Sequence, residues 1–181
     1  MLITLGVVVG VVLAWAALVP APAVAQPKVA FVTSVSGNGD LGTWSGSGGL
    51  TGLAGGDAIC QARAAAAGLD NPQDFVAWLS NEEVDAYCHL HGLTGTVATN
   101  CGQAELPASA GPWVRTDGVP FMDRIDRALD PEHRVLTTID MDEFGAEFET
   151  TVNYWTATGT SGQAVLPVGL YQSHACANWS A

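Results

Sequence analysis

The chain has 181 residues, with six Lys or Arg against eighteen Asp or Glu, so its formal net charge is −12. Nucleic acids and anionic membrane surfaces bind through clusters of basic side chains, and this composition excludes both as partners. Hydrophobic residues make up 48% of the chain, which excludes wholesale disorder and is enough for a folded core.

Residues 1–25 predict a cleaved secretory signal peptide. Residues 2–18 form an almost continuous apolar run, prolines follow, and Ala23-Val24-Ala25 has the small-x-small pattern of a cleavage site. An uncleaved membrane anchor is the alternative, because the run approaches the length of a membrane-spanning helix. With cleavage near Ala25 we expect one domain, residues 26–181, that is secreted, periplasmic or held at the cell surface.

The first half of this domain predicts a strand, a loop and a helix. Lys28–Ser34 is rich in β-branched and aromatic residues, which are typical of strands. The glycine-rich residues 36–52 predict an exposed, inserted loop, because clustered glycines favour neither helix nor strand. An alanine-rich helix should follow, with Asp57 as its N-cap or first-turn acid and Gly68 as the residue that ends it.

The middle of the chain combines a buried strand with a second insertion. Phe75–Ser80 is a short apolar run and predicts a buried strand. Residues 81–110 show no hydrophobic period and predict an irregular insertion. Residues 111–120 predict a strand that meets an Asp117-Gly118 turn.

The last third predicts further short elements. Residues 121–129 have apolar side chains at helical spacing, and Val135–Ile139 is a strand candidate. A turn at Asp140–Gly145 precedes another strand at Thr151–Thr156. Short strands with two modest helices indicate an α+β fold.

The four cysteines are expected to form disulfides, because an exported chain enters an oxidising compartment. Cys88 and Cys101 lie close in sequence and can close a small loop. That pairing leaves Cys60 and Cys176 for each other or for partners outside the chain. A metal site at Cys88-His89-Leu90-His91 is the alternative, but zinc sites of this kind have paired ligands at both ends, and Cys101 stands alone.

Asp140, Asp142 and Glu143 form the densest acidic group and are the candidate calcium ligands. A twelve-residue calcium loop that starts at Asp140 requires a glutamate at its last position, which is Thr151 here, so that pattern fails. A turn between two strands explains the same residues. No cofactor is expected from the sequence, and calcium at this acidic group is the alternative.

Several segments match a known family in chain order: Val29–Ser34, Leu53–Gln61, Ala77–Ser80, Gly111–Gly118, Tyr154–Gly159 and Cys176–Ser180. They resemble a bacterial secreted domain family of unknown function with an endostatin-like, C-type-lectin-like fold. Residues 36–52 and 81–110 are insertions relative to that family.

The resemblance implies a C-type-lectin-like α+β domain with short antiparallel strands and two helices. In that arrangement Cys60 pairs with a terminal cysteine and Cys176 with a neighbouring one, and both partners would follow Ala181. The resemblance therefore indicates a C-terminally truncated chain, with a substitute Cys60–Cys176 bond as the alternative.

The functional expectation is a secreted or cell-surface binding module that is not an enzyme and recognises a glycan or an extracellular protein. Trp44 in the glycine-rich loop is the best candidate contact, while Trp113, Trp155 and Trp179 are further aromatics that could stack on a sugar. No serine stands in a nucleophile elbow, and the histidines show no catalytic pattern. An exported carboxylate-dependent hydrolase and a structural envelope protein remain the alternatives.

Overall fold

The computed structural model describes residues 26–108, 111–129, 135–148, 156–158, 162–164 and 179–180. The predicted signal peptide and almost all of the strand predicted at Thr151–Thr156 lie outside these ranges. Within them, no helix has both the length and the apolar character needed to cross a membrane.

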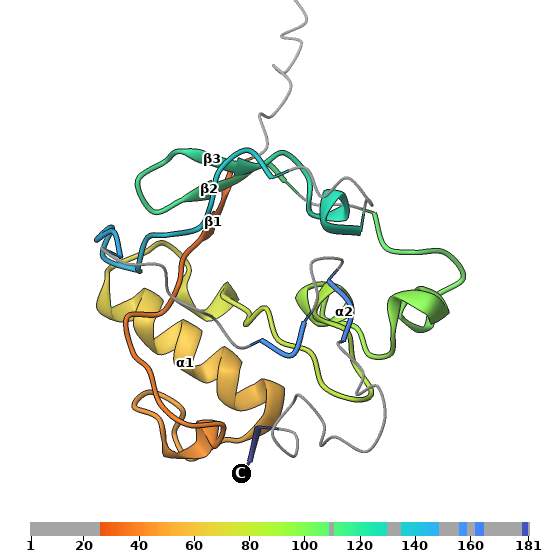
Figure 1. The fold of residues 1–181 in the computed structure, drawn as a ribbon, viewed down its shortest axis with the longest axis horizontal. Helices are drawn as coiled ribbons and strands as arrows, with labels where there is room; N and C mark the ends of the chain where they lie inside the picture. The colour runs from red at the N-terminus through yellow and green to blue at the C-terminus, as the bar shows by residue number, and fades with distance from the viewer. Residues whose placement is uncertain are drawn as a thin grey trace, which may run out of the picture.

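A three-stranded mixed sheet forms one end of the molecule (Figure 1). Its strands are β1 (Lys28–Ala30), β2 (Trp113–Arg115) and β3 (Pro120–Met122). β1 runs parallel to β2, and β3 runs antiparallel to it. The predicted α+β class is confirmed, whereas the expectation of antiparallel strands is wrong for β1 and β2. A long connection that contains both α-helices separates these two strands, and such a crossover allows parallel pairing.

The hairpin between β2 and β3 is the one that Asp117-Gly118 predicts. The Gly118 amide donates to the Arg115 carbonyl at 2.9 Å, and the Arg115 amide donates to the Val119 carbonyl at 2.9 Å. Gly118 has a φ of +82°, a conformation that glycine adopts without strain. The turn therefore follows from local chemistry alone.

The helix predicted at residues 121–129 forms only in its second half. Residues 120–122 belong to β3, where Met122 pairs with Trp113 and is buried. A 3-10 helix, η4, covers Ile125–Leu129. The pairing with β2 overrides the helical spacing at the start of this segment, which is a tertiary effect.

Helix α1 (Gly52–Ala66) begins five residues before Asp57 and has Thr51 as its N-cap, so the prediction of Asp57 as an N-cap or first-turn acid is wrong. The three glycines in its first turns are buried. A Cβ on Gly55 would collide with the Leu50 carbonyl oxygen, and one on Gly56 would lie 2.5 Å from Leu79 Cδ1. Glycine is needed at these two helical positions because the chain packs against them more closely than any side chain would allow.

The end of α1 agrees with the sequence prediction. Gly68 has a φ of +70°, its amide donates to the Ala65 carbonyl at 3.1 Å, and the Leu69 amide donates to the Ala64 carbonyl at 3.0 Å. These two bonds form a Schellman motif, in which a left-handed glycine satisfies the last carbonyls of the helix.

The strands predicted at Phe75–Ser80 and Val135–Ile139 do not form. Ala77 and Ser80 are buried as expected, but their amides donate to the Asp57 carboxylate at 2.8 Å and to the Thr156 carbonyl at 3.1 Å. In Val135–Ile139, the Leu136 amide donates to the Phe121 carbonyl at 2.8 Å, but this bond does not continue into a ladder of strand hydrogen bonds. An apolar run becomes a strand only where a neighbouring strand supplies its hydrogen bonds.

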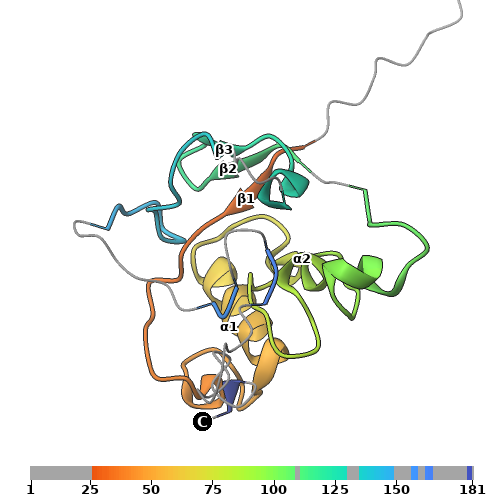
Figure 2. The ribbon, with the colours of Figure 1, turned by 45° about the vertical axis from the view of Figure 1, so that its right-hand side comes forward.

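The core has two clusters of buried side chains. One contains Tyr87, Cys88, Cys101, Met122, Ile125 and Ala128, and the other contains Leu41, Ile59, Ala157 and Trp179. In Figures 1 and 2, α1 runs toward the sheet from the opposite end of the molecule, where the 3-10 helix η1 (Leu41–Thr43) and the final described residues lie. An antiparallel bridge between Asp40 and Ser180 joins those two segments.

We expect Gly55→Ala to lower the free energy of unfolding by about 1–3 kcal/mol, because its Cβ has no room beside the Leu50 carbonyl. The same change in an open helix position would stabilise by roughly 1 kcal/mol. Ala65→Gly, at an exposed position of α1, measures that propensity difference in the same helix. Urea unfolding gives both values, and a stabilised Gly55→Ala protein would contradict the close packing.

Candidate ligand-binding site

Trp44 follows a tight turn in the glycine-rich stretch. The turn is the 3-10 helix η1 (Leu41–Thr43), and Asp40 caps it by accepting a hydrogen bond from the Gly42 amide at 3.1 Å. The Trp44 amide donates to the Leu41 carbonyl at 3.1 Å, and the Leu41 side chain is buried. The predicted exposed loop therefore contains an ordered turn, which Leu41 anchors in the core.

Ser47 is a buried residue that stabilises this loop through hydrogen bonds to its backbone. Nothing in the sequence pattern indicated this role. It is 1% exposed, and its hydroxyl lies 2.9 Å from the Trp44 carbonyl oxygen and 3.1 Å from that of Gly42. The same hydroxyl accepts from the Gly49 amide at 3.2 Å. Buried backbone groups outside helices and sheets need such partners, so Ser47 keeps the loop closed behind Trp44.

The indole of Trp44 is held in one position although it is only half-buried. Its Nε1 donates to the Asn38 carbonyl at 2.9 Å. Gly37 lies so close that a Cβ there would be 2.5 Å from Nε1. The ring also packs against the cluster that contains Leu41 and Ile59. Trp44 is thus a fixed aromatic surface rather than a freely moving side chain.

An open pocket lies beside this ring. Its volume is ≈390 Å³, and its lining consists of Val35, Ser36, Gly37, Asn38, Thr43, Trp44 and Ser45. Pockets for small ligands are typically about 300–1,000 Å³ and combine apolar surface with a few polar groups. The lining includes no charged side chain, although the protein as a whole is strongly acidic.

The pocket carries hydrogen-bonding groups that the described residues leave unused. Asn38 Oδ1 accepts from the Asp40 amide at 3.1 Å and lies 3.4 Å from the Thr43 hydroxyl. Since a backbone N–H can only donate, the oxygen of the carboxamide must face Asp40. The Asn38 amino group therefore keeps two donors without a partner in the described part of the chain. The hydroxyls of Ser36 and Ser45 also have none there.

The other tryptophans named as sugar contacts do not offer this combination. Trp179 is 3% exposed, and its Nε1 donates to the Ser80 carbonyl at 3.0 Å, so it belongs to the core. Trp113 is half-buried in β2, with the Lys28 ammonium 5.9 Å from its ring centroid. Trp155 lies outside the described residues.

The structure does not assemble the three candidate calcium ligands into one site. The turn at Asp140–Gly145 forms as predicted, but Asp140 pairs with Arg115, and Asp142 Oδ1 accepts from the Phe144 amide at 2.9 Å and the Ala146 amide at 2.8 Å. Across the described ranges, no three His, Cys, Asp or Glu side chains are placed to hold a metal ion. The carboxylates stabilise the turn and its neighbours.

Glu143, the third candidate, is the most deeply buried acid of the three, at 1% exposure. It forms an ion pair with Arg63 of α1, accepts from the Ser34 amide at 2.8 Å and lies 2.6 Å from the Ser34 hydroxyl. Burial raises the pKa of this carboxyl, but the hydrogen bonds from Ser34 and Arg63 outweigh it and hold the pKa below its ordinary value. The sequence does contain one signal for this pair. Arg63 lies on the apolar face of α1, and an arginine in such a position needs an acid as its partner.

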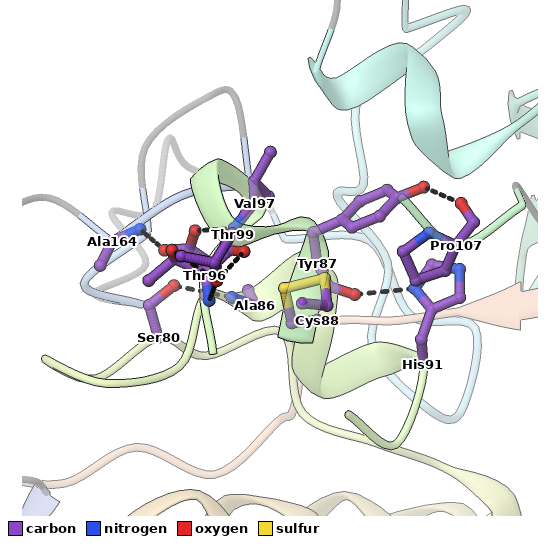
Figure 3. The surroundings of a disulfide bond; sticks show 12 residues. Ser80, Ala86, Tyr87, Cys88, His91, Thr96, Val97, Thr99, Pro107 and Ala164 are labelled. Carbon is purple, nitrogen blue, oxygen red and sulfur yellow. Dashed lines mark hydrogen bonds between the residues drawn. A yellow bond between two sulfur atoms is a disulfide. The ribbon is translucent and has the colours of Figure 1, made fainter. Parts of the chain in front are cut away.

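The predicted Cys88–Cys101 disulfide is confirmed (Figure 3). It joins α2 (Ala86–Leu90) to η3 (Val97–Gly102), and both cysteines are buried. Residues 81–110, which show no period, therefore contain two short helices and part of a core cluster. The short elements have too few residues to establish a hydrophobic period.

The surroundings of the disulfide also account for the histidines of the metal alternative. His91 Nδ1 lies 2.8 Å from the Tyr87 carbonyl oxygen, and the Tyr87 hydroxyl donates to the Pro107 carbonyl at 3.0 Å (Figure 3). His89 Nε2 lies 2.9 Å from Asp57 Oδ1. His91 Nε2 also lies 3.2 Å from the Ala108 carbonyl oxygen. Both rings therefore connect α2 to neighbouring segments, and the cysteine beside them is committed to the disulfide.

Cys60 is a free thiol, and Cys176 lies outside the described residues. Burial raises the pKa of Cys60 to about 12, and the nearby charges of Asp57 and Glu143 act in the same direction. A thiol with such a pKa is almost entirely protonated at neutral pH, so it is a poor nucleophile. Cys60 is a packing residue of α1.

Comparison with known proteins provides no relative for this chain. No protein-family model matches it, and comparisons with curated proteins and with solved structures also give no significant match. The function must therefore be argued from the geometry of the described residues.

Replacing both Cys88 and Cys101 by Ala should lower the free energy of unfolding by about 3 kcal/mol, because the disulfide closes a short loop in the unfolded chain. Cys60→Ala is the matched control, and we expect a loss of about 1 kcal/mol or less. Equal losses in urea unfolding of the two variants would show that the disulfide adds nothing.

Glu143→Gln should cost about 2–3 kcal/mol at pH 7, somewhat below the ~3–5 kcal/mol of a fully buried pair, because Arg63 reaches solvent. Since the folded pKa of Glu143 is depressed, its contribution is full above the unfolded value near 4.5 and declines as pH falls toward the folded pKa. The stability difference between wild type and variant should therefore shrink below about pH 4.5. Glu82→Gln, at an exposed position, should change stability by under about 0.5 kcal/mol. A difference that is constant with pH in chemical unfolding would contradict the assignment.

Proposed function

We propose that this protein is a secreted or cell-surface binding module that is not an enzyme and that binds a glycan through the Trp44 pocket. The observation that carries the proposal is a fixed, half-exposed indole beside an open pocket with unused hydrogen-bonding groups. A sugar ring offers the complementary surface, with C–H groups on its face and hydroxyls around its edge.

The construction of the site supports binding. Nε1 of Trp44 and the close approach of Gly37 immobilise the ring in the absence of a ligand. A preorganised contact surface loses little conformational entropy when a ligand arrives, so more of the contact energy appears as affinity. Aromatic rings with a polar rim are favoured in recognition sites for this reason.

The wider features of the chain are consistent with the proposal. The apolar leader and the Cys88–Cys101 disulfide suit an exported protein. The resemblance to C-type-lectin-like domains supports a ligand-binding scaffold, although a fold does not by itself determine a ligand. The carboxylates of Asp140, Asp142 and Glu143 are engaged in internal bonds, which favours a binding module over a carboxylate-dependent hydrolase.

Glycan and matrix-protein arrays probed with the purified protein test the proposal, and we expect binding to a subset of glycans. Trp44→Ala should weaken the strongest of these interactions at least tenfold, which corresponds to about 1.4 kcal/mol. Leu50→Ala is the matched control, because Leu50 is an exposed apolar residue of the same loop that does not line the pocket.

The binding constants should be measured by calorimetry, with circular dichroism showing that both variants are folded. Wild-type binding no greater than that of the denatured protein would refute the proposed function. So would a folded Trp44→Ala protein that binds as tightly as Leu50→Ala.

A further inference from the structure

We infer that the Trp44 pocket selects an uncharged sugar ring and discriminates against both uronic acids and protonated amino sugars. This inference rests on the proposed function and adds the chemical class of the ligand. It follows from which charges are near the pocket, which are committed elsewhere, and which neutral groups remain.

Among the described residues that line this pocket, an anionic ligand would find no cation to pair with. The lining has no Lys or Arg, and the only lysine of the chain, Lys28, lies over Trp113 in the sheet, at the other end of the molecule (Figure 1). Each arginine in the described part of the chain is already paired with acids: Arg63 with Glu143, Arg115 with Asp117 and Asp140, Arg124 with Asp126, and Arg127 with Asp123. A carboxylate on the ligand would lose water without gaining a counter-charge, which is unfavourable.

The net charge adds to this effect at long range. A protein of charge −12 repels anions and attracts cations over distances of about a Debye length, roughly 8 Å at physiological salt. This field alone would favour a cationic ligand. Discrimination against a cation must therefore come from the residues of the pocket itself.

A cationic ligand would find no carboxylate in the lining. Asp40, the acid of this loop, directs Oδ1 to the Gly42 amide as a helix cap. One indole, without further aromatic rings around the pocket, contributes only about 0.5–1 kcal/mol to a cation at an exposed site. An ammonium group would therefore lose part of its hydration for a weak contact.

A neutral sugar ring matches the groups that remain. The amino group of Asn38 supplies two donors, and the hydroxyls of Ser36 and Ser45 can each donate and accept. Sugar hydroxyls also donate and accept, so they can satisfy all three side chains without a net charge. The Val35 side chain and the Trp44 ring provide the apolar surface against which the face of the ring can pack. With ≈390 Å³, the pocket is near the lower limit of ligand sites, about 300 Å³, which suits a short saccharide unit.

The test compares ligands that differ only in charge, by calorimetric titration of the purified protein. The probes are the methyl glycosides of glucose and galactose, the corresponding glucuronate and galacturonate, and glucosamine and galactosamine at pH 6. For a configuration that binds, we expect the neutral sugar to bind at least tenfold more tightly than both charged relatives. Equal or tighter binding of a uronate or an amino sugar would overturn the inference.

Measurements in 0.5 M NaCl separate the pocket from the overall charge, because the Debye length then falls to roughly 4 Å. We expect the preference over the uronate to persist. If it disappears, the preference comes from the net charge and the assignment to the pocket is wrong.

The variant Trp44→Ala distinguishes this inference from the proposed function. If a charged sugar binds as tightly as its neutral relative or more tightly, and Trp44→Ala abolishes that binding, the neutral preference is refuted and the binding function stays intact. Failure of all six probes, together with failure of the glycan arrays, would refute both. A neutral preference that Trp44→Ala removes supports both.

Discussion

The ion pair between the buried Glu143 and the partly exposed Arg63 is the constraint on which the arrangement of this protein depends. A carboxylate at 1% exposure is stable only if it is paired and hydrogen-bonded, and removal of either partner leaves an uncompensated charge. The pair joins α1 to the turn at Asp140–Gly145, and the Ser34 amide and hydroxyl bind the same carboxylate. Val32 forms a parallel bridge to Asp142, the residue before Glu143. The position of α1 relative to the sheet is thereby determined.

This constraint extends along α1 to the candidate site. Arg63 belongs to the last turn of α1 and the buried glycines to its first turns, and the C-terminal end of the helix is the one nearer the sheet (Figure 2). There the Leu50 carbonyl approaches Gly55 so closely that no side chain fits between them. Leu50 closes the loop that begins before Trp44, and Leu41 of that loop packs against Ile59 of α1. A loop with this many fixed points holds Trp44 in place although its sequence is rich in glycine.

The sequence predicted those features whose cause is local. The Asp117-Gly118 hairpin and the Gly68 helix end need only the backbone freedom of glycine, and the Cys88–Cys101 bond needs only proximity along the chain. Features with a distant cause were missed or misread. The start of α1 depends on the approach of Leu50, and the failure of Phe75–Ser80 to form a strand depends on the absence of a neighbouring ladder. Glu143 was considered as a calcium ligand because Asp140 and Asp142 stand beside it in the sequence, and its pairing with Arg63, 80 residues away, was not foreseen.

The candidate site shows the same division. Trp44 could be selected from the sequence as the best exposed aromatic candidate, since it stands in a glycine-rich stretch that predicts a loop. The residues around Trp44 could not be predicted as parts of the site. The orientation of Asn38 depends on the Asp40 amide, and the immobility of the indole depends on Gly37. Glycine therefore has two roles in this stretch. It allows the tight turn, and because it lacks a side chain it allows the backbone to pack directly against the indole. A fixed aromatic surface can be built from a sequence that composition alone would describe as flexible.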